Sequence, residues 1–265
     1  MIVDSHCHLE MYGSNVEMAL SDLERNGIIA ISLSNGVPSF ERTLQIARQC
    51  KMVIPGFGIN PHNATDVVDD LEIIREYAKR SIILGEIGLD HFFAKEPSTY
   101  PLQEDLFTVF LEVAENQDAI LSIHSRGADL DVIRMLDSYS ISRVVIHGFD
   151  QDQSIAQQFT DRGVYLSFGA LITERYSDIV PQWEDVREAA SQIPEDLILI
   201  ETDAPGVWID ELPAERLFQV LSTLSALRLQ LPRDTQDQVN RNFIRLVDGI
   251  TEFEEQKSLV QSDIA

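Results

Sequence analysis

The chain has 265 residues, of which 44 % are hydrophobic and 24 % are charged, so it can bury a sizeable core without disulfides as staples. Its formal charge of −24 argues against non-specific adhesion to nucleic acid, which needs a basic surface to displace counterions. That charge does not exclude a polyanionic substrate, because a metal centre with a few local cations can hold phosphates on an acidic protein. The sequence has no basic leader and no apolar run of membrane-spanning length, so we expect neither a secreted nor a membrane protein.

The cysteine content indicates a reducing compartment. Cys7 and Cys50 are the two cysteines of the chain, too few for a disulfide framework in a sequence of this length. We expect both to be small packed residues and the protein to be cytoplasmic. The sequence gives no sign of an obligate protein partner.

Short apolar runs alternate with longer amphipathic patterns along the chain. The apolar runs predict strands at 1–6, 28–33, 52–59, 81–84, 119–123, 143–146, 163–168 and 197–200. The amphipathic patterns predict helices over 15–25, 39–49, 67–79, 101–115, 128–136, 153–160, 184–190, 215–227 and 235–246. The segment 89–100 is a long loop, and residues 251–265 are a polar, acidic tail that we expect to be frayed.

Eight strand–helix units in an uninterrupted chain predict an α/β fold. Right-handed crossovers keep such strands parallel, so we expect a single (β/α)8 TIM barrel over residues 1–250. The alternative is a doubly wound open sheet, which usually has fewer strands and gathers its ligand at one switch point. Polar residues follow strands one, four, five, six and eight, and only a closed ring brings those five strand ends together.

Six side chains at these strand ends are candidate metal ligands. Alternate residues of a strand face the same way, so His6 and His8 project to one side and Cys7 to the other. Four later strand ends each add an imidazole or a carboxylate: Glu86, His124, His147 and Asp203. One catalytic zinc ion takes three or four such ligands, so six suit two divalent ions about 3.5–4 Å apart with a shared carboxylate. Glu86 is the expected bridge, because its strand lies between the first strand and the fifth and sixth.

The sequence resembles the TatD family of metal-dependent deoxyribonucleases, within the barrel metallohydrolases. The matching stretches are VDSHCHL at 3–9, GEIGLD at 85–90, IHSR at 123–126, IHGF at 146–149 and ETDAP at 201–205. They follow the family order, and the resemblance covers about residues 1–250.

This resemblance implies two divalent metal ions that serve a phosphodiesterase. The first ion would be held by His6, His8, Glu86 and Asp203, and the second by Glu86, His124 and His147. The ions could be Mg²⁺, Mn²⁺ or Zn²⁺, because mixed imidazole and carboxylate ligands accept all three. Family members commonly act on DNA and trim it from the 3′ end, so single-stranded DNA or 3′ ends are the expected substrate.

The expected chemistry is attack on phosphorus by a water that two metal ions activate. Glu86 and Asp203 are the candidate catalytic residues, with Asp203 accepting the proton as a hypothesis. Asp4 shares a strand face with His6 and either orients that imidazole or satisfies loop amides.

Three further residues are candidate substrate contacts. Arg126 resembles the family's arginine beside the fifth-strand histidine and is the best candidate for a phosphate contact, the alternative being a surface pair with Asp129. Lys95 reaches a phosphate from the long loop or is solvated beside Glu96. His62 is a candidate at the substrate rim.

The chain departs from the family pattern around the expected substrate, not at the metals. Asn60 replaces an imidazole of the usual Gly-x-His-Pro-His stretch, His91 replaces an aromatic residue, and Gly206 replaces a large one. These departures leave the substrate open, so the first alternative is a barrel hydrolase that cleaves an ester, lactone or amide in a small molecule or an aminoacyl-tRNA. The second alternative is a degenerate, non-catalytic barrel, which loss of a metal ligand would support, whereas all six candidate ligands are present.

Overall fold

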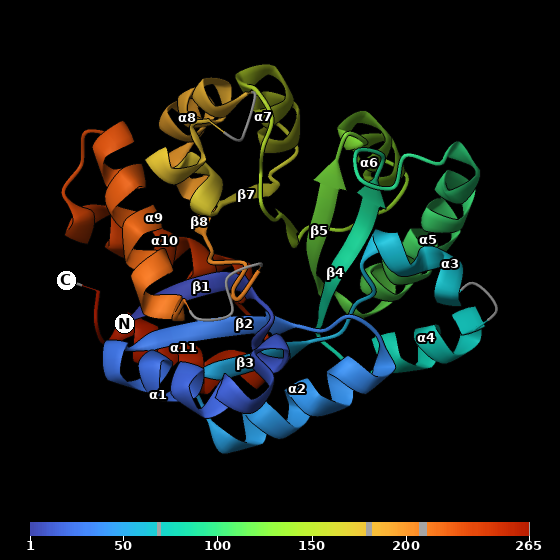
Figure 1. Ribbon diagram of the computed structural model, residues 1–265, viewed down its shortest axis with the longest axis horizontal. Coiled ribbons are helices and arrows are strands. Elements are labelled where there is room, and N and C mark those ends of the chain that lie inside the picture. The colour runs from blue at the N-terminus through green and yellow to red at the C-terminus, as the bar shows by residue number, and fades with distance from the viewer. Residues whose placement is uncertain (68–69, 179–181, 207–210, 265) are drawn as a thin grey trace.

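In the part of the chain that the structure describes, eight strands and the helices between them make up the fold. The computed structural model describes residues 1–67, 70–178, 182–206 and 211–264 (Figure 1). The strands are β1 Ile2–Cys7, β2 Ile28–Leu33, β3 Val53–Gly56, β4 Ile83–Asp90, β5 Ile120–Arg126, β6 Val144–Ile146, β7 Tyr165–Phe168 and β8 Ile198–Ile200.

Helices follow the strands along the chain. They are α1 Val16–Asn26, α2 Val37–Gln49, α3 Ala64–Val67, α4 Leu71–Ala78, α5 Tyr100–Gln117, α6 Asp129–Leu136, α7 Gln153–Thr160, α8 Trp183–Gln192, α9 Pro213–Leu227, α10 Pro232–Leu246 and α11 Glu254–Gln261. Short 3-10 helices span Leu9–Asn15, Pro61–Asn63, Pro97–Thr99, Ala170–Ile172, Glu174–Tyr176, Glu195–Leu197 and Thr251–Phe253.

The strands form a closed parallel barrel. Ladders join β1-β2-β3 and β4-β5-β6-β7-β8, and every pair is parallel. Phe57 joins β3 to β4, because its amide donates to Ile83 O at 3.0 Å and its carbonyl accepts from Gly85 N at 2.9 Å. On the other side the Asp203 amide donates to His6 O at 2.9 Å, which joins the end of β8 to β1. The predicted (β/α)8 barrel is therefore confirmed.

Local sequence explains why these segments become buried strands and covering helices. Every residue of β2 (IIAISL) is buried, as expected for a strand with the barrel interior on one face and helices on the other. Helix α1 packs Ala19, Leu20 and Leu23 against the barrel. It ends at Gly27, whose φ of 64° is the left-handed conformation that favours glycine at a helix C-terminus.

Two glycines allow backbone to approach the candidate metal site closely. A Cβ on Gly58 would lie 2.2 Å from the carbonyl carbon of Gly85 and 2.5 Å from the amide nitrogen of Glu86. A Cβ on Gly88, whose φ is +130°, would lie 2.1 Å from the carbonyl oxygen of His124. A side chain at either position would therefore displace β4 or β5, the strands that carry Glu86 and His124.

The structure corrects the prediction in three segments. Strand β4 continues to Asp90, so Glu86 lies within a strand and not at a corner after it. Strand β3 ends at Gly56, three residues before the predicted end at 59. The predicted helix 67–79 is observed over Leu71–Ala78, a separate helix α3 ends at Val67, and residues 68–69 lie outside the described residues.

The prediction of a frayed tail is wrong for most of the tail, because α11 forms there. Phe253 and Val260 are 3 % and 0 % exposed, so two apolar residues one heptad apart anchor the segment on the barrel. Lys257 pairs with Asp248, and the N-terminal amino group pairs with Asp263. Figure 1 accordingly shows the two termini close together beside α11. In the described ranges, no helix combines the length and the apolar character that a membrane crossing requires.

Candidate metal centre

The six predicted ligands meet at the carboxyl-terminal side of the barrel strands. They lie in or directly after β1, β4, β5, β6 and β8: His6, His8, Glu86, His124, His147 and Asp203. Five of these side chains are largely buried, whereas that of Asp203 is 52 % exposed. The cluster therefore opens toward solvent on the side of Asp203.

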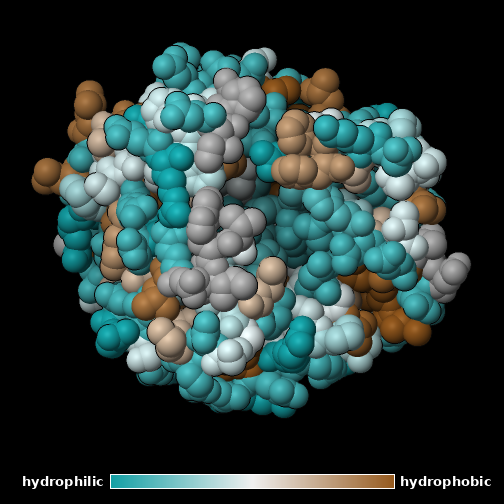
Figure 2. Space-filling view, viewed as in Figure 1, coloured by the Kyte–Doolittle hydropathy of each residue, from teal (hydrophilic) through white to brown (hydrophobic). Residues whose placement is uncertain are grey.

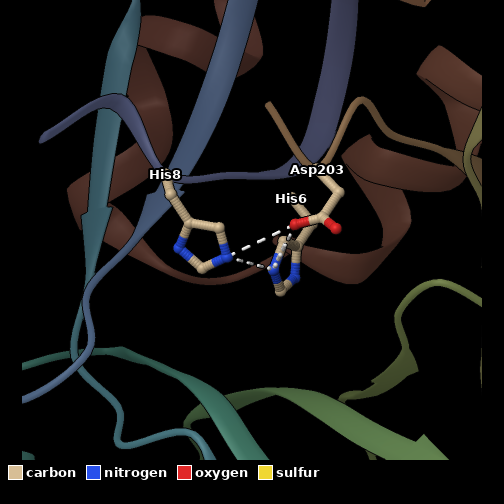
Figure 3. A group of neighbouring side chains, drawn as sticks. All are labelled: His6, His8 and Asp203. Atoms are coloured by element: carbon tan, nitrogen blue, oxygen red, sulfur yellow. Dashed lines mark hydrogen bonds and ion pairs between the residues drawn. The ribbon is translucent and has the colours of Figure 1, made fainter. Parts of the chain in front are cut away.

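The first half of the cluster joins the end of β1 to the segment after β8. Nε2 of His6 lies 3.2 Å from Nε2 of His8 and 3.9 Å from Oδ1 of Asp203. The same Asp203 oxygen lies 3.4 Å from Nε2 of His8, so the three side chains point toward one another (Figure 3). Asp203 has a φ of 50°, a left-handed conformation that aspartate tolerates better than most residues.

The second half of the cluster surrounds Glu86. Its Oε1 lies 2.8 Å from Nδ1 of His124 and 2.9 Å from Nε2 of His147, and those two nitrogens are 3.2 Å apart. Its other oxygen, Oε2, lies 3.5 Å from Nε2 of His8. The His147 ring also stacks on that of His6 with centroids 3.7 Å apart. One carboxylate therefore faces both halves of the cluster.

Each imidazole of the first half is anchored through the nitrogen that points away from the cluster. Nδ1 of His6 lies 3.0 Å from Oγ of Ser122, and Nδ1 of His8 donates to the carbonyl oxygen of Leu33 at 2.9 Å. Such partners fix the orientation of a metal-binding imidazole and leave its other nitrogen as the ligand atom. Nε2 of both residues is left facing Asp203.

The imidazoles of the second half are anchored by carboxylates. Nε2 of His124 donates to Oδ2 of Asp90 at 2.8 Å, and Nδ1 of His147 lies 3.4 Å from Oε1 of Glu201. The same Glu201 oxygen accepts from the amide of Gly148 at 2.8 Å, which fixes the carboxylate against the turn after His147. Both imidazoles therefore present their remaining nitrogen to Glu86.

These donors fit divalent metal ions. Nitrogen and oxygen ligands about 2.0–2.2 Å from one ion are roughly 3–3.5 Å from each other. The spacing from His8 to His6, Glu86 and Asp203 is 3.2–3.5 Å, with a longer 3.9 Å between His6 and Asp203. Imidazole and carboxylate are also the donor types that zinc and manganese accept.

The charges of the cluster depend on the contact between Glu86 and its histidines. Burial raises the pKa of Glu86, but the His147 and His124 imidazoles outweigh burial and hold that pKa well below its usual value. Burial lowers the pKa of His147, but Glu86 and Glu201 outweigh burial and raise it well above the usual value. These opposite shifts of the two pKa values favour an ionised Glu86 beside a protonated His147 in the metal-free protein.

Asp90, the last residue of β4, is the residue through which His62 joins the cluster. Its Oδ2 accepts from His62 Nε2 at 2.7 Å as well as from His124, and its side chain is fully buried. Its Oδ1 accepts from the amides of Phe92 and Phe93 at 2.8 and 2.6 Å. Donor atoms of His62, Asp90 and His124 lie within 4.8 Å of one another, and these hydrogen bonds account for that group. The predicted rim residue His62 thus supports His124 through Asp90.

Asp4 and Arg216 hold the segment that carries Asp203. The Asp4 carboxylate accepts from the amide and the hydroxyl of Thr202 at 2.9 and 2.5 Å, and from the amide of His6 at 3.3 Å. Of the two roles considered for Asp4, these contacts favour the one in which its carboxylate accepts hydrogen bonds from backbone amides over the one in which it orients the His6 imidazole. The buried Arg216 donates to the carbonyl oxygens of Thr202 and Pro205 at 3.1 Å each.

Of the two predicted cationic contacts, Arg126 is the last residue of β5 and Lys95 lies in the loop after β4. Nε of Arg126 is 3.0 Å from Oδ2 of Asp150, so its partner is not the Asp129 considered from the sequence. The Arg126 guanidinium and the Lys95 ammonium both lie over the Phe92 ring, at 5.2 and 5.7 Å from its centroid. Figure 2 shows a hydrophilic hollow in this face of the molecule, with moderately hydrophobic surface along its edge over the ends of β4 and β5.

Sequence reasoning missed four residues that orient the candidate ligands. They are Ser122, Asp90, Glu201 and Arg216. Asp90 lies in the same family stretch as the candidate ligand Glu86, and Glu201 in the same stretch as Asp203. Their places in these stretches could have indicated that they lie near the metal ions. Ser122 shares a strand face with His124, but nothing in the sequence links it to His6, and Arg216 carries no local signal, because only the closed barrel brings these partners together.

The sequence matches a known protein family and several known proteins over most of its length. The family model for TatD related DNase matches residues 3–248. An "Uncharacterized metal-dependent hydrolase" of Buchnera aphidicola subsp. Baizongia pistaciae is 26 % identical over 261 residues, or 92 % of this chain and 95 % of that protein. The "Putative deoxyribonuclease TATDN3" of Mus musculus is 25 % identical over 229 residues, or 80 % of this chain and 75 % of that protein.

A solved structure shares the fold. The crystal structure of YJJV, a TatD homolog from Escherichia coli K12, has a TM-score of 0.80 at 24 % identity and covers 92 % of this chain and 97 % of that chain. This likeness shows the fold, and the family model that matches residues 3–248 shows the family. The chain belongs to the TatD related DNase family and is a metal-dependent hydrolase.

Proposed function

We infer that the protein is a phosphodiesterase that uses two divalent metal ions and shortens single-stranded DNA from its 3′ end. The observation that carries this proposal is the position of Glu86. Its two oxygens face separate groups of imidazoles, Oε2 toward His8 and Oε1 toward His124 and His147. A carboxylate that is shared in this way is the arrangement expected for two ions about 3.5–4 Å apart.

When bound, the two ions would supply Lewis acidity, which lowers the pKa of a water and offsets negative charge on a phosphate. The protein's own residues would supply orientation and a proton acceptor. Asp203 Oδ1 faces His8, while more than half of the Asp203 side chain is open to solvent. This carboxylate can therefore accept a proton from an incoming water as the phosphodiester is cleaved.

The local cations support an anionic substrate. Arg126 at the end of β5 and Lys95 in the loop after β4 lie over one ring on a chain whose formal charge is −24, so they would concentrate positive charge near the metal ions. The printed name of the mouse relative, a putative deoxyribonuclease, supports DNA over other phosphodiesters. The free, buried thiols of Cys7 and Cys50 suit a reducing cytoplasm.

The charge of the whole chain favours a second candidate function. A formal charge of −24 repels long polyanions, so a hydrolase of esters, lactones or amides in a small molecule or in an aminoacyl-tRNA is the alternative. The same six ligands would serve attack on a carbonyl carbon.

The test compares these substrates on one metal-stripped preparation. Single-stranded oligonucleotides labelled at the 5′ or the 3′ end are incubated with Mg²⁺, Mn²⁺ or Zn²⁺, beside a panel of carboxylic esters, lactones and amides. We expect metal-dependent shortening from the 3′ end, and we expect its rate to fall by more than roughly a hundredfold in Glu86→Ala. Loss of a residue that only hydrogen-bonds to a metal ligand already lowers activity by about 10–100-fold, and Glu86 is itself a candidate ligand.

Glu41→Ala in α2 is the matched control, since Glu41 is an exposed glutamate paired with Arg80. Absence of DNA cleavage with every metal, together with turnover of an ester, lactone or amide, would replace the phosphodiesterase by the alternative.

A further inference from the structure

Two phenylalanines stand exposed where β4 meets the long loop that follows it. Phe92 and Phe93 are 50 % and 56 % exposed, although phenylalanine is among the residues most often buried in folded proteins. Their rings meet edge to face, with centroids 4.9 Å apart. We call these two rings, with Arg126 and Lys95, the aromatic edge.

The aromatic edge is connected to the metal centre by direct contacts. The Phe93 ring meets the His62 ring edge to face, with centroids 5.7 Å apart. His62 in turn donates to Asp90, the residue that orients the candidate ligand His124. The His62 ring also meets the His124 ring edge to face, with centroids 5.8 Å apart, so one side chain separates Phe93 from a residue of the metal centre.

The turn that carries the two rings has a fixed backbone. Oδ1 of the buried Asp90 accepts hydrogen bonds from the amides of Phe92 and Phe93, so the backbone of both residues is fixed. A Cβ on Gly127 would lie 3.4 Å from the amide nitrogen of Phe92, which shows how closely the β5 end packs beneath the turn. A fixed aromatic surface loses little conformational freedom when a ligand binds.

Positive charge lies over the same rings. The Arg126 guanidinium carbon is 4.7 Å from the Phe93 centroid and 5.2 Å from the Phe92 centroid. Its ion pair with the buried Asp150 holds the guanidinium there. Lys95 adds an ammonium 5.7 Å from the Phe92 centroid. An occupant of this edge should therefore combine a flat aromatic group with negative charge.

We propose that the aromatic edge is a stacking site for a nucleobase of the single-stranded substrate, next to the phosphodiester that is cleaved. This inference rests on the proposed function and names how the same site grips its substrate. A nucleobase offers the flat face and its phosphate the negative charge, and stacking on aromatic side chains tolerates every base. The site would thus favour unpaired bases over duplex DNA without selecting a sequence.

The experiment pairs removal of a ring with removal of a base. Wild type, Phe93→Ala and Phe92→Ala are assayed on a single-stranded oligonucleotide and on versions with an abasic residue at each position near the cleaved end. We expect KM on the intact oligonucleotide to rise roughly five- to a hundredfold in at least one variant, the range that stacking of one base gives, with a smaller change in kcat. In the variant whose KM rises, the abasic residue that raises KM of the wild type should change KM much less, because the ring on which the missing base would stack is already absent.

Three controls separate stacking from folding and packing. Phe93→Trp should keep a low KM and Phe93→Leu should not, because leucine retains apolar volume but offers no aromatic face. Phe218→Ala removes a 40 % exposed phenylalanine from α9, which lies on the other side of the molecule from β4 in Figure 1, and should not change KM. Metal stoichiometry of each variant reports whether its centre is intact.

The outcomes are distinct. Suppose that the wild type degrades DNA and that the abasic residue raises KM by the same factor in Phe92→Ala and Phe93→Ala as in the wild type. The ring and the base then act independently, so the stacking site is wrong while the proposed nuclease activity is retained. If wild type cleaves no DNA with any metal, the proposed function fails, and the stacking site fails with it.

Discussion

Oδ2 of Asp90 accepts a hydrogen bond from Nε2 of His124 at 2.8 Å, while the other ring nitrogen of His124, Nδ1, faces Glu86. Burial raises the pKa of Asp90, but the hydrogen bonds from His124 and His62 outweigh burial and hold that pKa far below its usual value. Asp90 is therefore a permanent anion that keeps the proton of His124 on Nε2 and leaves Nδ1 for a metal ion.

Asp90→Asn should weaken metal binding at the His124 side of the centre by about 10–100-fold, because the amide no longer enforces this tautomer. Titration of the metal-stripped protein with Mn²⁺ or Zn²⁺ measures the change. Asp131→Asn is the control, since Asp131 is a half-exposed aspartate of α6 that pairs with Arg134. Equal affinity in wild type and Asp90→Asn would rule out this role.

Arg216 should matter for both the stability of the fold and the position of Asp203. This buried arginine donates to the carbonyl oxygens of Thr202 and Pro205 and pairs with Glu211 at 2.7 Å. Arg216→Met should lower the free energy of unfolding by about 3 kcal/mol, the scale for breaking a buried ion pair, as measured by denaturant titration. Affinity for the metal ion at His6 and His8 should fall as well, and a variant with lower stability but unchanged affinity would contradict the second effect.

Metal binding should release protons at neutral pH. Burial lowers the pKa of His8, but the hydrogen bond and charge of Asp203 and the charge of Glu86 outweigh burial and raise it to about 9. Below pH 9 the metal-free His8 is protonated, whereas a metal ligand must be neutral, so binding of the ion that His8 holds displaces at least one proton at pH 7.

Apparent affinity should therefore rise with pH up to about 9 and change little from His8 above it. Calorimetry at pH 7 in buffers that differ in ionisation enthalpy counts the released protons. A binding enthalpy independent of the buffer would show that His8 is already neutral.

The tail should contribute to stability without affecting catalysis. Val260 of α11 is fully buried, so Val260→Ala should lower the free energy of unfolding by roughly 1–3 kcal/mol and leave kcat and KM as in wild type. Met18→Ala in α1 removes a 59 % exposed side chain and should cost much less. Equal thermal midpoints for wild type and Val260→Ala would mean that α11 adds nothing to the folded state.

The sequence was a good guide where a short local pattern carried the information. Alternation along a strand was enough to place His6 and His8 on one side, and helix α7 spans the residues that its pattern predicted. Helix α11 was not predicted because few apolar residues stand among its charged ones. Phe253, just before the helix, and Val260 within it are buried in the folded protein, and this burial cannot be inferred from the local sequence.

Contacts between distant segments could not be obtained from local patterns. Ser122 and His6 are 116 residues apart, and Arg216 reaches Thr202 across the turn after β8. The pairing of Arg126 was also misjudged, because Asp129 is near in sequence whereas Asp150 is near in space. Such partners become visible only when the ring of strands has closed.

A metal titration that follows binding and DNA cleavage in one experiment tests the two-ion centre. Metal-stripped protein receives increasing equivalents of Mn²⁺, and each mixture is assayed on 5′-labelled single-stranded DNA. We expect two bound ions per chain, cleavage that develops as the second ion binds, and loss of both the second ion and cleavage in Glu86→Ala. Full cleavage with one bound ion, or two bound ions without cleavage, would show that a two-ion phosphodiesterase is wrong.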